Sequence, residues 1–423
     1  MRILQLTQFY PPVIGGEERH VRNLGAALAR RGHEVSVATL RHPAAAVEEM
    51  DGDVRVLRLR GTLQRVGSLF TESDRRLAPP FPDPELLAGL ARVMRRQRPD
   101  IVHAHNWIVH SYLPLRPLFP ARLVQTLHDY SLVCARKNLM RQGRPCSGPA
   151  LGKCLTCARA HYGTAKGTVT ALATRASSPL VRSGVDRFLA VSCAVAALNG
   201  LEGHCEVVPN FIPDDLGAPP AIPPALPELL PDAPYMLFVG DLNYQKGVPV
   251  LLQAYRRLQD APPLVLIGRS YAEELRDLPP GVRVFSSWPH AAVLEAWRRC
   301  MFGLAPSVWP EPCATVVMEA MAFGKPMIVT DIGGMPDLVE GGRNGLLVPP
   351  GDAEALAAGM QRLLNDPGLR AQLAAGCLER IETLKAASVV ARIEAIYRDL
   401  LAKDASQRRN SEGAVHALPA ERS

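Results

Sequence analysis

Short runs of apolar residues alternate along most of the chain with longer segments whose apolar residues recur every three or four positions. Runs of the first kind are typical of buried strands, and the second pattern is typical of amphipathic helices. Strands that alternate with helices form parallel sheets with helices on both faces. In the first half the pattern predicts helices at about 17–31, 84–97 and 193–199, and strands at 3–7, 35–39, 54–59, 101–103, 123–127 and 188–191.

A proline-rich stretch separates this series from a second one. Residues 213–234 contain eight prolines and are predicted to be a linker. Beyond it the pattern predicts helices from about 248, at 290–299 and at 316–323, two or three helices over 352–402, and strands at 236–239, 264–267, 282–285, 301–305, 327–329 and 345–348.

The predicted fold class is α/β, with two doubly wound, Rossmann-like domains that face a cleft. The domains are residues 1–212, which include a cysteine-rich insertion at 134–163, and residues 235–385. Residues 386–405 are predicted to form a helix that packs back on the first domain, and 406–423 a disordered tail. Ligands bind such folds at the carboxyl ends of the strands, so we expect the site in the cleft.

Length and composition support this division. A chain of 423 residues is too long for one core, and 47% hydrophobic residues are typical of a globular protein. No apolar run reaches the ~18–20 residues that span a bilayer. The first residues resemble a short buried strand rather than a signal peptide, so we expect a cytoplasmic protein.

The net charge of +7 is unevenly distributed. Residues 1–212 carry 28 Lys and Arg against 16 Asp and Glu, whereas residues 213–423 carry 20 against 25. A basic domain attracts lipid-linked phosphates or an anionic membrane surface, and residues 90–98 are the candidate contact on the inner face of the membrane. Arginine-rich codon usage would explain the same excess. The sequence has no recognition helix, zinc-finger spacing or aromatic–basic platform, so nucleic acid is not an expected partner.

Several polar or flexible residues of the first half follow predicted strands. Paired glycines before a helix allow a ligand to approach the backbone, and a helix N-terminus favours anions. A histidine at neutral pH can bind a phosphate oxygen or take a proton. Tight turns and structural hydrogen bonds would explain the same residues. The candidates are Gly15, Gly16, Glu17, His105, His128 and Asp129.

The second half offers a lysine and two glutamates. Lys246 lies between a predicted strand and a glycine-led helix, where its charge can neutralise a diphosphate. Glu311 precedes a small-residue loop and Glu319 lies in the helix that follows it. Carboxylates on both sides of a helix N-terminus suit a nucleotide sugar. A helix-terminus charge would equally explain Glu319.

An ordered set of motifs makes the chain resemble a GT-B fold glycosyltransferase of family 4, which is retaining and uses nucleotide sugars. The similarity runs from residue 2 to about 365. Its motifs are 9–12 with 15–17, 31–35, 126–130, 246–247, the spacing from 311 to 319, 332–337 and 344–349.

The resemblance implies roles for these residues. His128 would face the transferred sugar, Lys246 would bind the diphosphate, Glu311 would hold sugar hydroxyls and Glu319 would hold the ribose. Gly15 and Gly16 would border the acceptor and the donor phosphates, with Glu17, His105 and Asp129 on the acceptor side. The amides of Cys313, Ala314 and Thr315 would reach sugar and phosphate. The family needs no cofactor for catalysis. Its acceptors are often lipid-linked or glycan intermediates of the cell envelope.

The chain departs from the family pattern at Asp241, where family members usually have arginine. This substitution removes a positive charge from the expected diphosphate site, and Arg269 at the next strand end is the candidate to compensate. Asp51-Gly52-Asp53 resembles a metal-binding Asp-x-Asp motif, but its place before a strand predicts a turn.

Two alternatives remain open. An epimerase or a glycogen-synthase-like polymerase on the same fold would share these motifs. A non-catalytic or partner-dependent subunit would explain Asp241, although it would not require both Glu311 and Glu319.

Four of the nine cysteines lie between residues 134 and 157. They have the pattern C-x11-C-x7-C-x2-C, and four thiolates suit tetrahedral zinc. Iron–sulfur ligation and four incidental thiols are the alternatives. The sequence predicts a structural zinc site in a turn-rich loop, with ligands Cys134, Cys146, Cys154 and Cys157.

Overall fold

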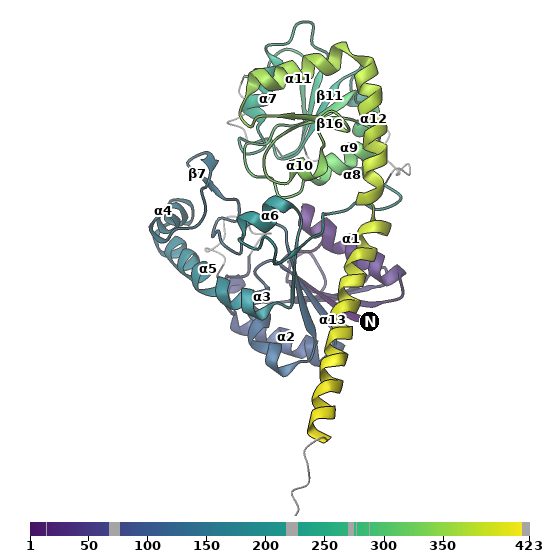
Figure 1. Cartoon of the computed structure of the whole chain (residues 1–423). Coiled ribbons are helices and arrows are strands. Elements are labelled where there is room, and N and C mark those ends of the chain that lie inside the picture. The colour runs from purple at the N-terminus through teal and green to yellow at the C-terminus, as the bar shows by residue number, and fades with distance from the viewer. Residues whose placement is uncertain are drawn as a thin grey trace, which may run out of the picture. The chain divides into compact units, whose positions relative to one another are not determined.

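The computed structural model describes residues 1–13, 15–66, 77–216, 227–269, 275, 277–286 and 288–416, with side chains up to 403 in the last helix. The chain forms two compact units (Figure 1). Unit 1 comprises residues 1–126, 173–189 and 390–423, and unit 2 comprises 127–172 and 190–389. Residues 217–226 of the predicted linker and 417–423 of the predicted tail lie outside the described residues.

The first sheet has eight strands in the order β10-β9-β6-β5-β1-β2-β4-β3. Strand β1 is parallel to β2 and β5, β2 is parallel to β4, β5 is parallel to β6, and β3 is antiparallel to β4. Its strands are β1 (Arg2–Thr7), β2 (Glu34–Leu40), β3 (Glu48–Asp51), β4 (Val54–Leu59), β5 (Ile101–His105), β6 (Arg122–Leu127), β9 (Arg187–Ala190) and β10 (Glu206–Val207). The helices between them are α1 (Gly16–Arg30), α2 (Pro84–Gln97), α3 (Val109–Tyr112) and α6 (Cys193–Leu198).

The second sheet has six parallel strands in the order β13-β12-β11-β14-β15-β16. They are β11 (Met236–Val239), β12 (Leu264–Ile267), β13 (Val282–Phe285), β14 (Phe302–Ala305), β15 (Met327–Thr330) and β16 (Gly345–Val348). The predicted α/β fold class, with two doubly wound sheets, is confirmed.

Helices cover both faces of the second sheet (Figure 1). Apolar residues of α7 (Val248–Tyr255) and α11 (Ala353–Asn365) share one core cluster with the strands. The other helices of this series are α8 (His290–Arg299), α9 (Thr315–Ala322), α10 (Met335–Leu338) and α12 (Pro367–Ile381). The Asp352 carboxylate accepts from the amides of Glu354 and Ala355, so α11 begins where this cap stands.

Helix α13 (Ala386–His416) corrects the expected C-terminal boundary. The tail was predicted to begin at 406, but the helix continues to His416. In unit 1, Glu394 of this helix lies 2.7 Å from Arg31 and 2.8 Å from His33. These ion pairs and the buried Tyr397 attach the helix to unit 1.

The cysteine-rich segment contains more regular structure than a loop. It forms a hairpin of β7 (Met140–Arg141) and β8 (Arg144–Pro145), followed by α4 (Leu151–Tyr162) and α5 (Thr164–Gly184). The pattern did not predict these helices because α4 has no side-chain cap and α5 is rich in Ala, Ser and Thr. None of the helices in the described part of the chain combines the length and hydropathy that crossing a bilayer requires.

Candidate functional site

Glu311 is the centre of a hydrogen-bonded group in unit 2. Its carboxylate accepts two bonds from Lys246 Nζ, at 2.8 and 2.6 Å. It also accepts from Trp309 Nε1 at 2.8 Å and Ser307 Oγ at 3.3 Å. The carboxylate is buried, so these donors offset the cost of removing its charge from water. Trp309 and Ser307 were not among the predicted residues, although both lie in the loop between β14 and α9.

The backbone around Gly247 brings Lys246 to this position. Gly247 has φ of 77°, and a Cβ there would lie 1.8 Å from the carbonyl oxygen of Pro306. Only glycine tolerates both this conformation and this contact. The turn that carries Lys246 therefore packs directly against the strand end that leads to Glu311.

A second close approach supports the Glu311 loop. The Gly334 amide donates to the Glu311 carbonyl oxygen at 2.7 Å. Gly333 has φ of 62°, and a Cβ there would lie 2.4 Å from the same oxygen. The glycine pair after β15 thus positions the loop.

Helix α9 begins at Thr315 immediately after this loop. Ala314 is its N-cap residue and provides no side-chain cap, which leaves the end of the helix able to bind an anion through backbone amides. Burial raises the pKa of the Cys313 thiol to about 12, so this side chain stays neutral. Any contribution of Cys313 to binding would come from its backbone.

Glu319 lies inside α9 and is buried. Its Oε1 atom is 2.8 Å from Nε2 of His290, the first residue of α8. His290 orients the carboxylate and was missed because its partner lies 29 positions away. A carboxylate oriented in this way is suited to accept hydrogen bonds from vicinal hydroxyl groups.

Asp241 and Arg269 form a bidentate pair with both distances at 3.0 Å. Arg269 is thus paired with Asp241 itself, and Lys246 is paired with Glu311 in the same way. The four charges of these two pairs sum to zero. The role expected of Arg269 at a diphosphate stays a prediction.

The first loop of unit 1 places Glu17 at the start of α1. Its Oε1 atom accepts from Thr7 Oγ1 at 3.3 Å and from the Asn106 side-chain amide. Asn106 has φ of 109°, a conformation that non-glycine residues adopt mainly at constrained sites. Gly15 is the extended N-cap of α1, and a Cβ on Gly16 would meet nothing within 4 Å. Gly16 thus leaves an open approach to this helix end.

Asp51 fixes the neighbouring part of the loop. Its carboxylate accepts from Tyr10 OH at 2.8 Å and from Arg22 at 2.7 and 2.8 Å. Asp51 ends β3, and residues 52–53 form the turn into β4, as predicted for this Asp-Gly-Asp sequence.

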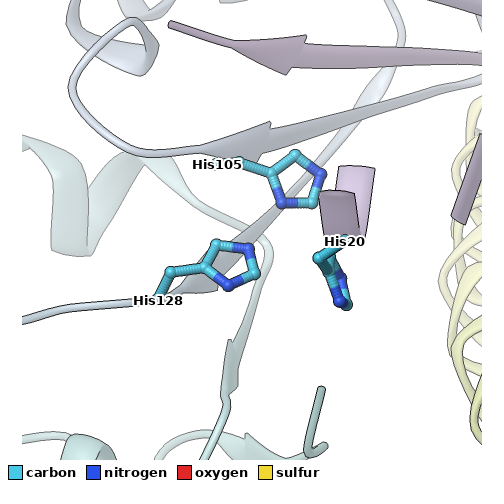
Figure 2. A group of neighbouring side chains, drawn as sticks. All are labelled: His20, His105 and His128. Atoms are coloured by element: carbon cyan, nitrogen blue, oxygen red, sulfur yellow. The ribbon is translucent and has the colours of Figure 1, made fainter. Parts of the chain in front are cut away.

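Three buried histidines lie together beside β5. His105 is bonded through Nε2 to Gln5 Oε1 at 2.6 Å, and its ring is 6.0 Å from that of His20 on α1 (Figure 2). The His103 ring lies 4.3 Å from that of His105. Burial lowers the pKa of His20 to about 4 and that of His103 to about 3. Burial therefore keeps His20 and His103 neutral at pH 7. These two residues were not predicted because they share a buried environment only after folding.

His128 and Asp129 directly follow β6, and His128 is half-buried (Figure 2). The Asp129 carboxylate accepts from the Ser131 amide at 2.8 Å and so caps a turn. Within unit 2, Tyr130 OH donates to the Pro310 carbonyl oxygen at 2.7 Å, next to Glu311. The acceptor role of Asp129 and the sugar-facing role of His128 stay predictions.

Comparisons with known proteins agree with this fold. A family model described as Glycosyltransferase Family 4 matches residues 14–216, and one described as Glycosyl transferases group 1 matches residues 233–366. A glycogen synthase of Mycobacterium tuberculosis is 28% identical over 413 residues, which cover 90% of each chain.

Solved structures show the same fold. Sucrose-phosphate synthase from Thermosynechococcus elongatus has a TM-score of 0.72 and 22% identity, covering 95% of this chain and 100% of that one. The Anabaena protein HepE in complex with UDP-glucose has a TM-score of 0.66 and 18% identity, covering 95% and 99%.

Enzymes of the GT-B class contain two Rossmann-like sheets, and the loops of each sheet lie at the carboxyl ends of its parallel strands. The chain is a glycosyltransferase of this class and belongs with the family 4 and group 1 glycosyltransferases. The resemblance noted in the sequence is confirmed.

Proposed function

We propose that this enzyme transfers a sugar from a nucleotide-sugar donor to a hydroxyl of an anionic acceptor, with retention of anomeric configuration. The observation that carries the proposal is the Lys246–Glu311 pair at the start of α9. This pair places a cation for a diphosphate, a carboxylate for sugar hydroxyls and a helix N-terminus in one group. The UDP-glucose bound to HepE supports a nucleotide-sugar donor.

Donor binding has a simple chemical logic in this arrangement. A diphosphate would attract Lys246 away from Glu311, and the released carboxylate would then accept hydrogen bonds from the sugar. Glu319, oriented by His290, would accept from the ribose hydroxyls. No step of this scheme requires a divalent cation, because the lysine and the helix end supply the positive potential.

A cavity of about 380 Å³ in unit 1 supports an anionic acceptor. Phe9 and Leu40 give it apolar walls, and Arg41 and Arg60 give it positive charge. An acceptor with a phosphate, such as a lipid-linked or polysaccharide intermediate of the cell envelope, would suit this mixture. The basic balance of the first half agrees with a protein that works on such an acceptor at the inner face of the membrane.

The donor is tested first by thermal shift with GDP-, UDP-, dTDP- and ADP-sugars. A ligand present at 100 times its Kd adds about 2.7 kcal/mol of stability, so one nucleotide should raise the melting temperature clearly above the others. Glu319→Ala should reduce this shift, whereas Glu354→Ala, an exposed carboxylate on α11, should not.

Three results would contradict parts of the proposal. No shift with any nucleotide would favour a partner-dependent or non-catalytic subunit, for which the Asp241–Arg269 pair is the structural argument. Release or conversion of the nucleotide sugar without any acceptor would favour an epimerase. An inverted anomer in the product, read by NMR, would refute retention.

The acceptor is tested with the double substitution Arg41→Ala/Arg60→Ala. Hydrogen bonds to charged groups contribute about 1.5–3 kcal/mol, so the acceptor KM should rise roughly 10-fold or more for a phosphorylated acceptor. The donor KM and the KM for a neutral glycan acceptor should not change. Arg55→Ala on strand β4, where the arginine pairs with Glu48 at 2.7 Å, is the control. An equal loss with neutral and phosphorylated acceptors would refute recognition of the anion.

A further inference from the structure

Four cysteine thiols that are separated in sequence line one small cavity in unit 2. Cys134 lies in the turns after β6, Cys146 follows the β7–β8 hairpin, and Cys154 and Cys157 lie one turn apart on α4. The cavity has a volume of about 30 Å³. This volume is close to that of one water molecule in the liquid, so the cavity suits a single ion rather than an organic ligand.

N–H donors and cations lie near three of the four sulfur atoms. Burial raises the pKa of the Cys134 thiol, and the backbone N–H groups of residues 136–139 oppose this effect. The Ala150 amide lies 3.4 Å from Cys154 Sγ, and Arg136 Nη1 lies 3.7 Å from Cys157 Sγ. Arg141 and Lys153 also line the cavity. N–H donors and cations stabilise sulfur in its negative form, which is the form that binds metal.

The segment has a small apolar cluster of its own. Its buried apolar cluster consists of Ala135, Ala158 and Ala171, with Leu155 and Tyr162 packed against them. A core of this size supplies little hydrophobic stabilisation, and small substructures of this kind are usually held by disulfides or a metal. All four cysteines are free thiols in the structure.

We propose that Cys134, Cys146, Cys154 and Cys157 bind one zinc ion as four thiolates. Zn–S bonds of about 2.3 Å in a tetrahedron place the sulfur atoms about 3.8 Å apart. Among the described cysteines, no set of three has all its sulfur atoms within 4.8 Å of one another. Zinc binding therefore requires the thiols to turn further into the cavity. This movement breaks two weak contacts. Cys146 Sγ lies 3.5 Å from Gly148 O, and Cys157 Sγ lies 3.8 Å from Met140 O.

The zinc has a structural role that reaches the donor half of unit 2. The cysteine-rich segment that the zinc would stabilise begins after Tyr130. The Tyr130 hydroxyl donates a hydrogen bond to the Pro310 carbonyl oxygen at 2.7 Å. The hairpin in the same segment offers the Gly143 carbonyl to Tyr244 OH at 3.1 Å, two residues before Lys246. A zinc-stabilised segment would keep both contacts in place, so metal loss should raise the donor KM as well as lower stability.

The experiment is metal analysis of the full chain, purified without a histidine tag after expression with added zinc. We expect one zinc per chain, four sulfur neighbours at about 2.3 Å by X-ray absorption, and no visible absorption from an iron–sulfur cluster. Cys154→Ser/Cys157→Ser should lose the zinc. Cys193→Ser and Cys205→Ser, whose thiols lie outside the cavity, should keep it.

A second measurement does not depend on the folding of a variant. A mercurial reagent added stepwise to the wild-type protein should release one zinc as the four cavity thiols react, and a colorimetric zinc indicator reads the release. Wild-type protein without stoichiometric metal, with iron in place of zinc, or with the four cysteines joined as two disulfides by mass spectrometry would each overturn the proposal. Because the zinc content is measured without substrate, failure of the proposed glycosyl transfer would leave this test unaffected.

Discussion

Replacing Lys246 with methionine should lower the rate of sugar transfer by about 10²–10³-fold, the loss typical when a donor to a developing negative charge is removed. The lysine is the charged group placed at the start of α9, and methionine keeps much of its length without its charge. The effect should fall on kcat as well as on donor KM, because the charge on the leaving diphosphate grows as the sugar–phosphate bond breaks. The measurement is steady-state release of nucleoside diphosphate.

The same substitution leaves Glu311 buried without its cation, so lost activity has to be separated from lost stability. Removing one partner of a buried pair costs up to about 3–5 kcal/mol. Here the cost should be smaller, because Trp309 and Ser307 still donate to the carboxylate and the lysine is 28% exposed.

The double variant Lys246→Met/Glu311→Gln removes both charges and should regain stability while staying inactive. Lys403→Ala, which removes an exposed pair with Asp399 on α13, is the control for a lysine without a catalytic environment. If the double variant regained activity, or if Lys246→Met transferred sugar at the wild-type rate, the role of Lys246 would be refuted.

Acidification should destabilise unit 1 between about pH 6.5 and pH 4 through two buried histidines. In the folded protein the pKa of His20 is about 4 and that of His103 about 3, against 6.5 for an exposed imidazole. The cause in both is burial, with repulsion from His20 as a smaller cause for His103. His103 is also held between Tyr397 OH at 2.6 Å and Thr126 Oγ1 at 2.7 Å.

The direction follows from proton binding. Between these pKa values the unfolded chain binds protons that the folded protein excludes, so stability is complete above about pH 6.5 and falls below it. Inside this window, protonation of each histidine lowers the free energy of unfolding by about 1.4 kcal/mol per pH unit. At pH 5 the loss is about 2 kcal/mol for each histidine. Together they amount to a large part of the 5–15 kcal/mol typical of a domain. The carboxylates Asp51 and Asp100, whose pKa is lowered by arginine partners, act only at lower pH.

The test measures local stability, because a chain with two units need not unfold in one step. Hydrogen exchange of β1 and β5, corrected for the intrinsic pH dependence, should show protection that falls from pH 7 to pH 5. His103→Gln should reduce this slope by about half, and the exposed His204→Gln should not change it. If protection fell equally with pH in the wild type and in His103→Gln, burial of His103 would not be the cause of the acid destabilisation.

The order of the elements could be read from the sequence because it depends on local periodicity. The helix expected at 84–97 is α2, Pro84–Gln97, where the Asp83 cap, proline at the first helical position and an apolar face agree. The motifs around Lys246, Glu311 and Glu319 were also visible, because they lie in a strand–turn–helix or loop–helix sequence with its own local signature. The helices α4 and α5 were missed, because small and polar residues gave no apolar period.

The sequence by itself determined the fold class, the two series of strands and helices, the residues of the donor motifs and the existence of a cysteine cluster. Only the tertiary structure decided how these residues pair. Lys246 and Glu311 are 65 positions apart, Asp241 and Arg269 are 28 apart, and His103 and Tyr397 are 294 apart. The first two contacts form because parallel strands bring distant loops to one edge of a sheet, and the third forms because helix α13 packs against strand β5. Hydrogen bonding and burial decide which charged residues of the site are paired and which are removed from water. These properties cannot be read from local sequence patterns.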